Sequence, residues 1–260
     1  MAKDKKVKQD NFIKFLGTAG ARFVMIKQLR ASGGIWIKVK NTNVMIDPGP
    51  GSIVRCASSK PKLDPSQLDA IILTHRHLDH SNDVNVMIEA MTEGGFKKKG
   101  CLFLPKDALG EDSVVLKHTL NFVGSVEFLK EKTDYSVGEF SFTTGPRNLH
   151  PVETYGLKFA INKKTISLIG DTAFYPGILD FYKSDILIIN TVFYEPRPAV
   201  QHLSFEETRN IIEKLRPKTT ILTHFGMTML KAKPHILVEN LKQELNLDII
   251  AAYDGMSLTL

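Results

Sequence analysis

The chain has 260 residues, of which 43% are hydrophobic, and its formal net charge is +6 at pH 7. This length fits one large domain or two small ones and is sufficient for a sizeable core. We expect no transmembrane helix, because no apolar run reaches about eighteen residues. The charged segment 1–12 precedes no long apolar stretch, so we expect no secretory signal. The two cysteines do not make a disulfide framework. A cytoplasmic location is therefore predicted.

The positive charge is concentrated at the start of the chain, where we predict a flexible basic tail over residues 1–10. A basic surface favours anionic partners such as phosphates or RNA. A solvated tail that keeps the protein in solution explains the same charge. The lysines in this segment are Lys3, Lys5, Lys6 and Lys8.

Short apolar, β-branched segments recur along the chain and predict β-strands. They lie at 34–40, 43–47, 70–75, 101–104, 138–144, 155–161, 165–171, 185–190, 219–224 and 247–253. Helical patterns are fewer and lie at 81–93, 204–215 and 234–245. Ser204 and Glu207 form the capping-box pattern at the start of the second helix. We find no internal boundary, so we predict a single α/β domain over residues 1–260, with two sheets and helices outside them.

Side chains capable of chemistry come at the ends of several predicted strands. Asp47, His75, Asp171 and His224 each end one of these strands. In open α/β proteins, ligands bind in the crevice at the carboxyl ends of strands, where the following loop can aim a side chain. Four such endings are not expected from packing alone. The sequence therefore predicts a functional site at one edge of the sheets.

The segment "THRHLDH" concentrates potential metal ligands within a few positions. His75, His77, Asp79 and His80 carry imidazole nitrogens and carboxylate oxygens, which suit zinc, iron and manganese. In an extended segment His75 and His77 face the same side, while Asp79 and His80 follow a turn and can face a second ion. Further candidate ligands are His150, Asp171 and His224. We predict two divalent metal ions, with zinc favoured and manganese or iron as alternatives.

This order of motifs resembles the metallo-β-lactamase fold superfamily. The resemblance covers nearly the whole chain, from 15–23 through 46–51 to "AAYDGMSLTL" at the end. It implies a four-layer αββα sandwich with a dinuclear metal site at one edge of the sheets. By that resemblance, one ion is held by His75, His77 and His150, the other by Asp79, His80 and His224, and Asp171 bridges them. Asp47 would lie behind the site and orient the ligands.

Two positions narrow the implied chemistry. The bridging position is Asp171, where metal-dependent β-lactamases often have cysteine. The second motif position is His77, where the di-iron oxygen reductases have glutamate. Hydrolysis with zinc-like metals is therefore favoured. We expect a hydroxide shared by the two ions to attack the substrate, with Asp79, Asp171 and His202 as the catalytic residues.

The segment 201–226 resembles the phosphodiesterase branch, which includes the tRNA 3′-processing endonuclease and the phosphoribosyl cyclic phosphodiesterase. There the residue matching His202 lies beside the scissile phosphate, and an imidazole can protonate the leaving group. The endonuclease's extended glycine-rich arm has no evident counterpart in this sequence, so tight tRNA binding is not favoured.

The favoured substrate is accordingly a small or cyclic nucleotide-like phosphodiester. A lactone, thioester or other carboxylic ester is the alternative, and an RNA-processing or RNA-binding role is a second alternative. We expect Arg30, Tyr175 and Arg197 to contact an anionic ester substrate. No membrane partner is expected, and a homodimer is compatible with the sequence.

Overall fold

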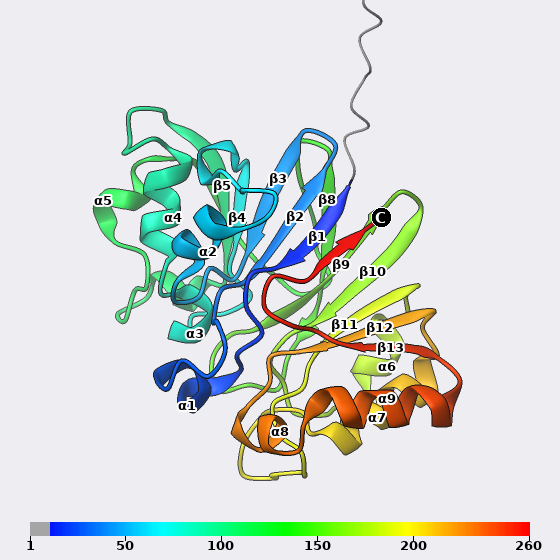
Figure 1. The fold of residues 1–260 in the computed structure, drawn as a ribbon. Helices are drawn as coiled ribbons and strands as arrows, with labels where there is room; N and C mark the ends of the chain where they lie inside the picture. Colours follow the sequence, from blue (N-terminus) through cyan, green and yellow to red (C-terminus); the bar gives the residue numbers. More distant parts are fainter. Residues whose placement is uncertain (1–10) are drawn as a thin grey trace, which may run out of the picture.

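The computed structural model describes residues 11–260, and the predicted basic tail over residues 1–10 lies outside the described residues. Two seven-stranded sheets lie face to face at the centre of the molecule (Figure 1). The strands of the first sheet, in spatial order, are β14 (Ser257–Thr259), β1 (Phe12–Phe15), β2 (Ile35–Val39), β3 (Thr42–Ile46), β4 (Ala70–Ile72), β5 (Lys99–Leu104) and β6 (Val123–Phe128). Those of the second are β13 (Asp248–Ala251), β12 (Thr219–Thr223), β11 (Ile186–Asn190), β10 (Lys164–Ile169), β9 (Tyr155–Ile161), β8 (Phe140–Arg147) and β7 (Asp134–Val137).

Helices cover the outer face of each sheet (Figure 1). Most helices of the first half pack on the first sheet, and those of the second half pack on the second. The first set comprises α1 (Ala21–Ile26), α2 (Ser52–Ser58), η1 (Pro65–Gln67), α3 (Leu78–Ser81), α4 (Val84–Met91), η2 (Lys106–Leu109) and α5 (Lys117–Leu120). The second comprises α6 (Gly177–Phe181), α7 (Phe205–Leu215), α8 (Met227–Lys231) and α9 (Pro234–Leu245).

Three apolar layers separate the four layers of secondary structure. The central one lies between the sheets and includes Phe15 and Leu157. A second, around Trp36, packs the first sheet on its helices, and a third, around Ile211, packs the second sheet on α6, α7 and α9. The predicted αββα sandwich is therefore confirmed.

The strand pairing brings the carboxyl ends of several strands to one edge of the sandwich. Strands β3, β4, β5 and β6 run parallel in the first sheet. Strands β10, β11, β12 and β13 run parallel in the second. Parallel neighbours end at the same edge, so the loops that follow them meet there.

The segment 81–93 differs from the prediction in its start. The pattern predicts one helix over this segment. Instead, Ser81 ends the short helix α3, Asp83 precedes α4, and α4 begins at Val84. Helix α3 is a single turn that follows His77 and contains Asp79 and His80. Within residues 11–260 the longest helix, α9, has 12 residues, and none of the described helices could cross a bilayer.

The capping box at the start of α7 is confirmed, and it carries the first prediction. The Glu207 amide donates to Ser204 Oγ, and the Ser204 amide donates to Glu207 Oε2 at 2.8 Å. Ser204→Ala is expected to lower the free energy of unfolding by about 1 kcal/mol, the usual value of such a cap. Urea denaturation measures this, and the exposed Ser136→Ala on β7 should stay within about 0.5 kcal/mol of the wild type. Equal stability of both variants would contradict the role of the cap.

Candidate metal centre

The predicted ligands converge where the strands end. Asp47 follows β3 directly, and His224 follows β12 directly. His75 lies in the loop after β4, and Asp171 lies in the loop after β10. His150 lies in the loop between β8 and β9. Both sheets therefore contribute ligands to one site, as the strand-end pattern predicts.

Two of these residues have a backbone conformation that side chains rarely adopt. Asp47 has φ 51° and His224 has φ 60°, both in the left-handed region. Such strain is found where function requires a side chain to be aimed. Gly20 packs against His224 so closely that a Cβ at Gly20 would lie 2.0 Å from the His224 carbonyl oxygen. The position of His224 is thus constrained by its own backbone conformation and by the close packing of Gly20 against it.

One cluster consists of His75, His77 and His150, whose ligand atoms all lie within 4.8 Å of one another. His77 Nδ1 and His150 Nε2 are 3.1 Å apart. The other ring nitrogen of His150, Nδ1, donates to the Gln201 carbonyl at 3.0 Å. That bond leaves the Nε2 lone pair of His150 directed into the cluster.

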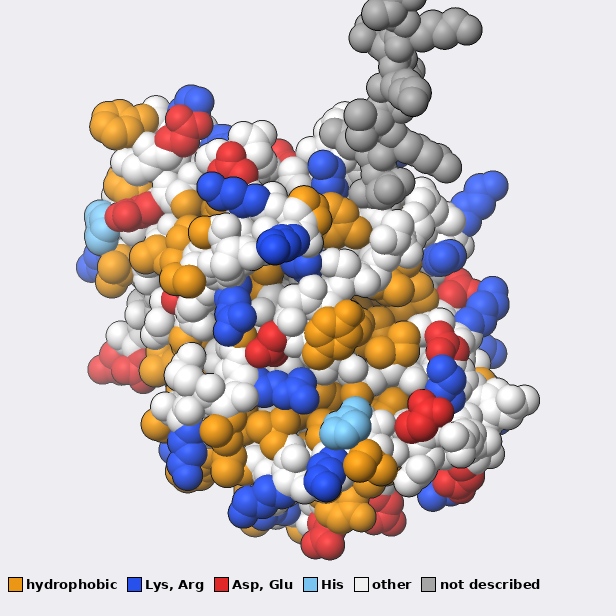
Figure 2. All heavy atoms as spheres, in the orientation of Figure 1, with side chains coloured by type: hydrophobic (Ala, Val, Ile, Leu, Met, Phe, Trp, Pro, Cys, Tyr) orange, Lys and Arg blue, Asp and Glu red, His pale blue; other side chains and the backbone are white. Residues whose placement is uncertain are grey.

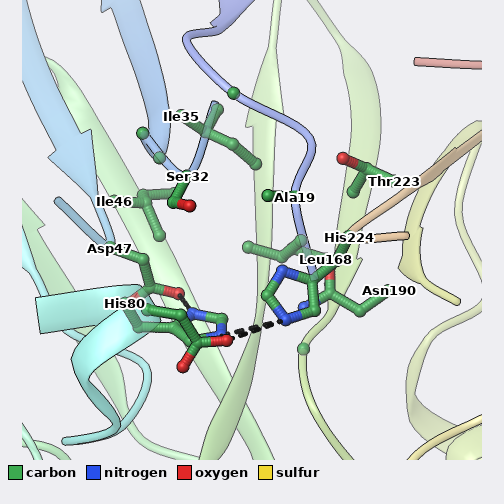
Figure 3. A pocket seen from close by; sticks show the side chains of 15 residues that line it. Ala19, Ser32, Ile35, Ile46, Asp47, His80, Leu168, Asn190, Thr223 and His224 are labelled. Atoms are coloured by element: carbon green, nitrogen blue, oxygen red, sulfur yellow. Dashed lines mark hydrogen bonds and ion pairs between the residues drawn. The ribbon is translucent and has the colours of Figure 1, made fainter. Parts of the chain in front are cut away.

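A second cluster consists of Asp79, His80 and His224. His80 Nε2 lies 3.2 Å from His224 Nε2, and Asp79 Oδ2 lies 3.6 Å from His224 Nε2. His80 Nδ1 donates to Asp47 Oδ2 at 2.9 Å, which leaves Nε2 as its ligand atom. Figure 3 shows His80 between Asp47 and His224, with dashed lines marking both interactions.

Asp171 is buried between the two clusters. Its Oδ1 lies 3.4 Å from His224 Nε2, and its Oδ2 lies 3.4 Å from His80 Nε2. Its Oδ2 is also 3.8 Å from His75 Nε2 in the other cluster. One carboxylate therefore faces ligands of both groups, which is the arrangement that a bridging ligand requires.

Asp47 lies behind the ligands, and both of its carboxylate oxygens accept hydrogen bonds from neighbouring residues. The Thr74 amide donates to Asp47 Oδ1 at 2.7 Å, and Thr74 Oγ1 donates to Asp47 Oδ2 at 2.6 Å. Since that hydroxyl proton is used, His75 Nδ1 donates to Thr74 Oγ1 at 3.1 Å. Asp47 thus orients His80 directly and His75 through Thr74, as neighbours of metal ligands commonly do.

The arrangement fits divalent cations. His75 Nε2 is buried and has no hydrogen-bond partner among residues 11–260, which is costly for a polar atom unless something binds it. Nitrogens bound to one tetrahedral zinc ion lie about 3.4 Å apart, close to the 3.1 Å and 3.2 Å of the two histidine pairs. The residues present therefore suit divalent cations, which the clusters described above could hold.

The electrostatics favour neutral imidazoles in the first cluster. Burial lowers the pKa of His75 well below its usual value. Burial, then the neighbouring His150, lowers the pKa of His77 to about 4. Neutral histidine is the form that binds metal, so these two ligands are ready near neutral pH.

The second cluster instead favours positive charge. Burial lowers the pKa of His80, but the carboxylates of Asp79, Asp171 and Asp47 together raise it well above its usual value. Burial raises the pKa of Asp171, but His224, His202 and His80 hold it well below its usual range. The Asp171 carboxylate thus remains ionised, and its negative charge stabilises a cation beside it.

His202 lies at the margin of the two clusters. Its Nδ1 is 3.6 Å from Asp171 Oδ2 and has no hydrogen-bond partner among the described residues. The His202 ring lies 5.1 Å from the His150 ring and 5.9 Å from the Phe193 ring, measured between centroids. The structure therefore brings His202 together with the seven predicted ligands.

The three predicted substrate residues are more scattered. Arg30 Nη1 donates to Thr18 Oγ1 at 2.8 Å and to the Ala252 carbonyl at 3.1 Å. The exposed Arg197 lies over the Phe193 ring, beside His202. Tyr175 donates through its hydroxyl to Asn148 Oδ1 at 3.3 Å, and burial raises its pKa to about 12. Asn148 in turn donates to the Asp171 carbonyl. Their roles toward a substrate stay predictions.

Asn190 is a site residue that the sequence analysis did not identify. It ends β11, it is buried, and its Nδ2 donates to Asp171 Oδ1 at 2.8 Å. Figure 3 shows it beside His224. The signal was present, because Asn190 ends a predicted strand as His224 and Asp171 do. Because an amide is a poor metal ligand, the search for metal ligands at strand ends did not include Asn190.

Asn190 should therefore matter for metal binding. Asn190→Ala removes the hydrogen bond that orients the bridging carboxylate, and metal affinity is expected to fall about 10- to 100-fold. Competition with a chelator measures the affinity, and circular dichroism should report an unchanged fold. Asn210→Ala on the outer helix α7 is the matched control. An affinity of Asn190→Ala equal to that of the control would contradict the role.

Comparison with known proteins agrees with this geometry. Residues 42–225, more than half of the chain, match the family described as the Beta-lactamase superfamily domain. The protein MJ1374 of Methanocaldococcus jannaschii is 29% identical over 256 residues, covering 95% of this chain and 94% of that protein. The crystal structure of the metallo-β-lactamase fold protein YhfI from Bacillus subtilis has a TM-score of 0.75 and 18% identity, over 96% of this chain and all of that one. A diphosphatase from the PhnP family has a TM-score of 0.70 and 21% identity, over 96% and 97%.

The fold and site define a metal-binding hydrolase scaffold with candidate metal ligands from both sheets of an αββα sandwich. The chain belongs to the β-lactamase superfamily, in its metallo-β-lactamase fold. The resemblance stated from the sequence is thereby confirmed.

Proposed function

We propose that the protein is a phosphodiesterase that uses two divalent cations and acts on a small anionic ester. The observation that carries this proposal is the position of His202, which lies beside Asp171 at 3.6 Å and beside the His150 ring. It adds a titratable imidazole to the seven proposed ligands. The likeness to a diphosphatase of the PhnP family supports a phosphorus-containing substrate.

The cations, when bound, would lower the pKa of a water to near neutrality and offset negative charge on the substrate. Zinc suits this ligand set, and manganese and iron are alternatives. His75, His77 and His150 would hold one cation, Asp79, His80 and His224 the other, and Asp171 would join them. Asp47 and Asn190 hold these ligands in place through the hydrogen bonds described above.

His202 is the proposed proton donor to the leaving group. Burial lowers the pKa of His202, so the free site favours its neutral form. An anionic phosphodiester within hydrogen-bond distance raises that pKa again, because an opposite charge stabilises imidazolium. His202 therefore takes up a proton from solvent when the substrate binds, and this proton is available to a departing alkoxide. The negative charge of Asp171, which lies 3.6 Å from Nδ1 of His202, also raises the pKa of His202.

The test is turnover on a panel of chromogenic phosphodiesters, lactones and thioesters, each with zinc, manganese and iron. The proposal expects the highest kcat/KM on a phosphodiester. Highest activity on a lactone or thioester would replace the proposal with a carboxylic-ester hydrolase. Binding of RNA without turnover on any ester would instead favour the RNA-binding alternative.

A further inference from the structure

Large hydrophobic side chains are exposed in the loops that carry the proposed ligands and in the neighbouring segment around α1. Phe23 and Ile26 on α1 are 62% and 66% exposed, and Leu78 at the start of α3 is 59% exposed. Such residues, when they gather on one surface, mark a binding site more often than chance exposure does. We define the apolar rim as six of the exposed apolar residues in these segments: Phe23, Ile26, Leu29, Leu78, Leu149 and Val200.

Three members of the rim neighbour site residues in the chain, two of them proposed metal ligands and the third the proposed proton donor His202. Leu78 immediately precedes Asp79, and Leu149 immediately precedes His150. The carbonyl of Val200 accepts a hydrogen bond from the His202 amide at 2.8 Å. These three residues therefore lie in the loops that carry the site residues.

The other three members belong to the loop between β1 and β2. Gly20, which precedes α1, donates to the Phe225 carbonyl at 3.0 Å and packs against His224. Helix α1 also contacts α3, which carries Asp79 and His80 (Figure 1). Only Val24 of α1 is fully buried, so Phe23 and Ile26 are not needed for packing against the sheets.

Positive charge accompanies the rim. Segment 21–30 contains Arg22, Lys27 and Arg30 and no acidic residue. Arg197 lies in the same loop as Val200. Figure 2 shows hydrophobic and basic side chains side by side at the lower left, over the position of α1 in Figure 1. An anionic group with an apolar substituent matches both features, since the cations favour the charge and the rim covers the substituent.

We infer that the substrate is an anionic ester carrying an apolar group of several carbons, which lies against Phe23 and Ile26 while the charged group faces the cations. This inference rests on the proposed function, because it places the ester at the metal centre. It adds the chemical class of the part of the substrate that does not react.

The test uses metal-replete protein and two phosphonates that the enzyme cannot hydrolyse as esters, methylphosphonate and octylphosphonate. Isothermal titration calorimetry, with octylphosphonate kept below its micelle concentration, gives both values of Kd. We expect octylphosphonate to bind at least about tenfold more tightly, a gain that burial of about two methylene groups supplies. The double variant Phe23→Ser, Ile26→Ser should lose most of this ratio, with methylphosphonate binding unchanged.

Phe96 provides the control, because it is 93% exposed and lies in the turn after α4, outside the loops of the rim. Phe96→Ser should keep the wild-type ratio. Equal affinities for the two phosphonates, or no binding of either, would overturn the inference. A dimer seen by sedimentation velocity that is lost in the double variant, with the ratio unchanged, would also overturn it and assign the rim to contact between copies. The ester panel decides the proposed function separately, because these measurements need no turnover.

Discussion

Asp171→Ala is expected to reduce kcat/KM on the best ester substrate by about 10³-fold or more. Loss of a residue that only supports a ligand costs roughly 10- to 100-fold, and Asp171 is itself the carboxylate that faces both clusters. The cation proposed to bind Asp79, His80 and His224 should be lost before the cation proposed to bind His75, His77 and His150. Without Asp171, the group of Asp79, His80 and His224 retains less negative charge than cation binding needs. Steady-state kinetics and elemental analysis measure the two effects.

Two variants control this result. Asp171→Asn keeps the size of the side chain and removes its charge, so it should resemble alanine in activity while preserving packing. Asp180→Ala changes an exposed carboxylate on α6 and should leave activity unchanged. Near wild-type turnover of Asp171→Ala, with a normal circular dichroism spectrum, would rule out a mechanism that depends on two joined cations.

His202→Ala is expected to affect substrates according to their leaving group. On a phosphodiester with an alkyl leaving group the loss should be roughly 100-fold or more, the usual contribution of a general acid. On a nitrophenyl ester the loss should be much smaller, because nitrophenolate departs without a proton. Metal content should stay at the wild-type value, since His202 is outside the proposed ligand set. The ratio of the two losses is the quantity to measure.

The exposed His118, on α5, supplies the matched control, and His118→Ala should change neither rate. Small and equal losses on both esters for His202→Ala would show that His202 is not the proton donor, and the carboxylic-ester alternative would gain. A loss of metal in this variant would show that His202 belongs to the ligand set. His202, His150 and Asp171 also form a compact group of the kind that could hold a metal ion.

The sequence predicted the fold, and it predicted side chains that the structure brings close together, for a physical reason. Strands with short apolar runs are local patterns, and a metal ligand needs a specific side chain at a strand end. Asp171 and His224, which lie 53 positions apart in the chain by their numbers, could therefore be assigned to one site before their 3.4 Å separation was known.

The role of Asn190 in supporting the ligands and the exposure of the apolar rim could not be predicted from the sequence. Asn190 acts through the direction of its side chain toward Asp171, which depends on the register of β11 in the sheet. The exposure of Phe23 and Ile26 depends on where α1 packs, and six residues are too few for a clear helical pattern. Arg30 was selected for its charge alone, whereas its bonds to Thr18 and Ala252 depend on segments distant in sequence.

Metal stoichiometry tests the central claim most directly. The protein would be stripped with a chelator, reconstituted separately with zinc, manganese and iron, freed of excess metal and measured by elemental analysis. We predict about two ions per chain for the preferred metal, because seven ligand residues exceed the four positions of one tetrahedral ion. The His75→Ala, His77→Ala double variant and the His80→Ala, His224→Ala double variant should each retain about one. A reproducible value of zero in folded wild-type protein after reconstitution would contradict the account.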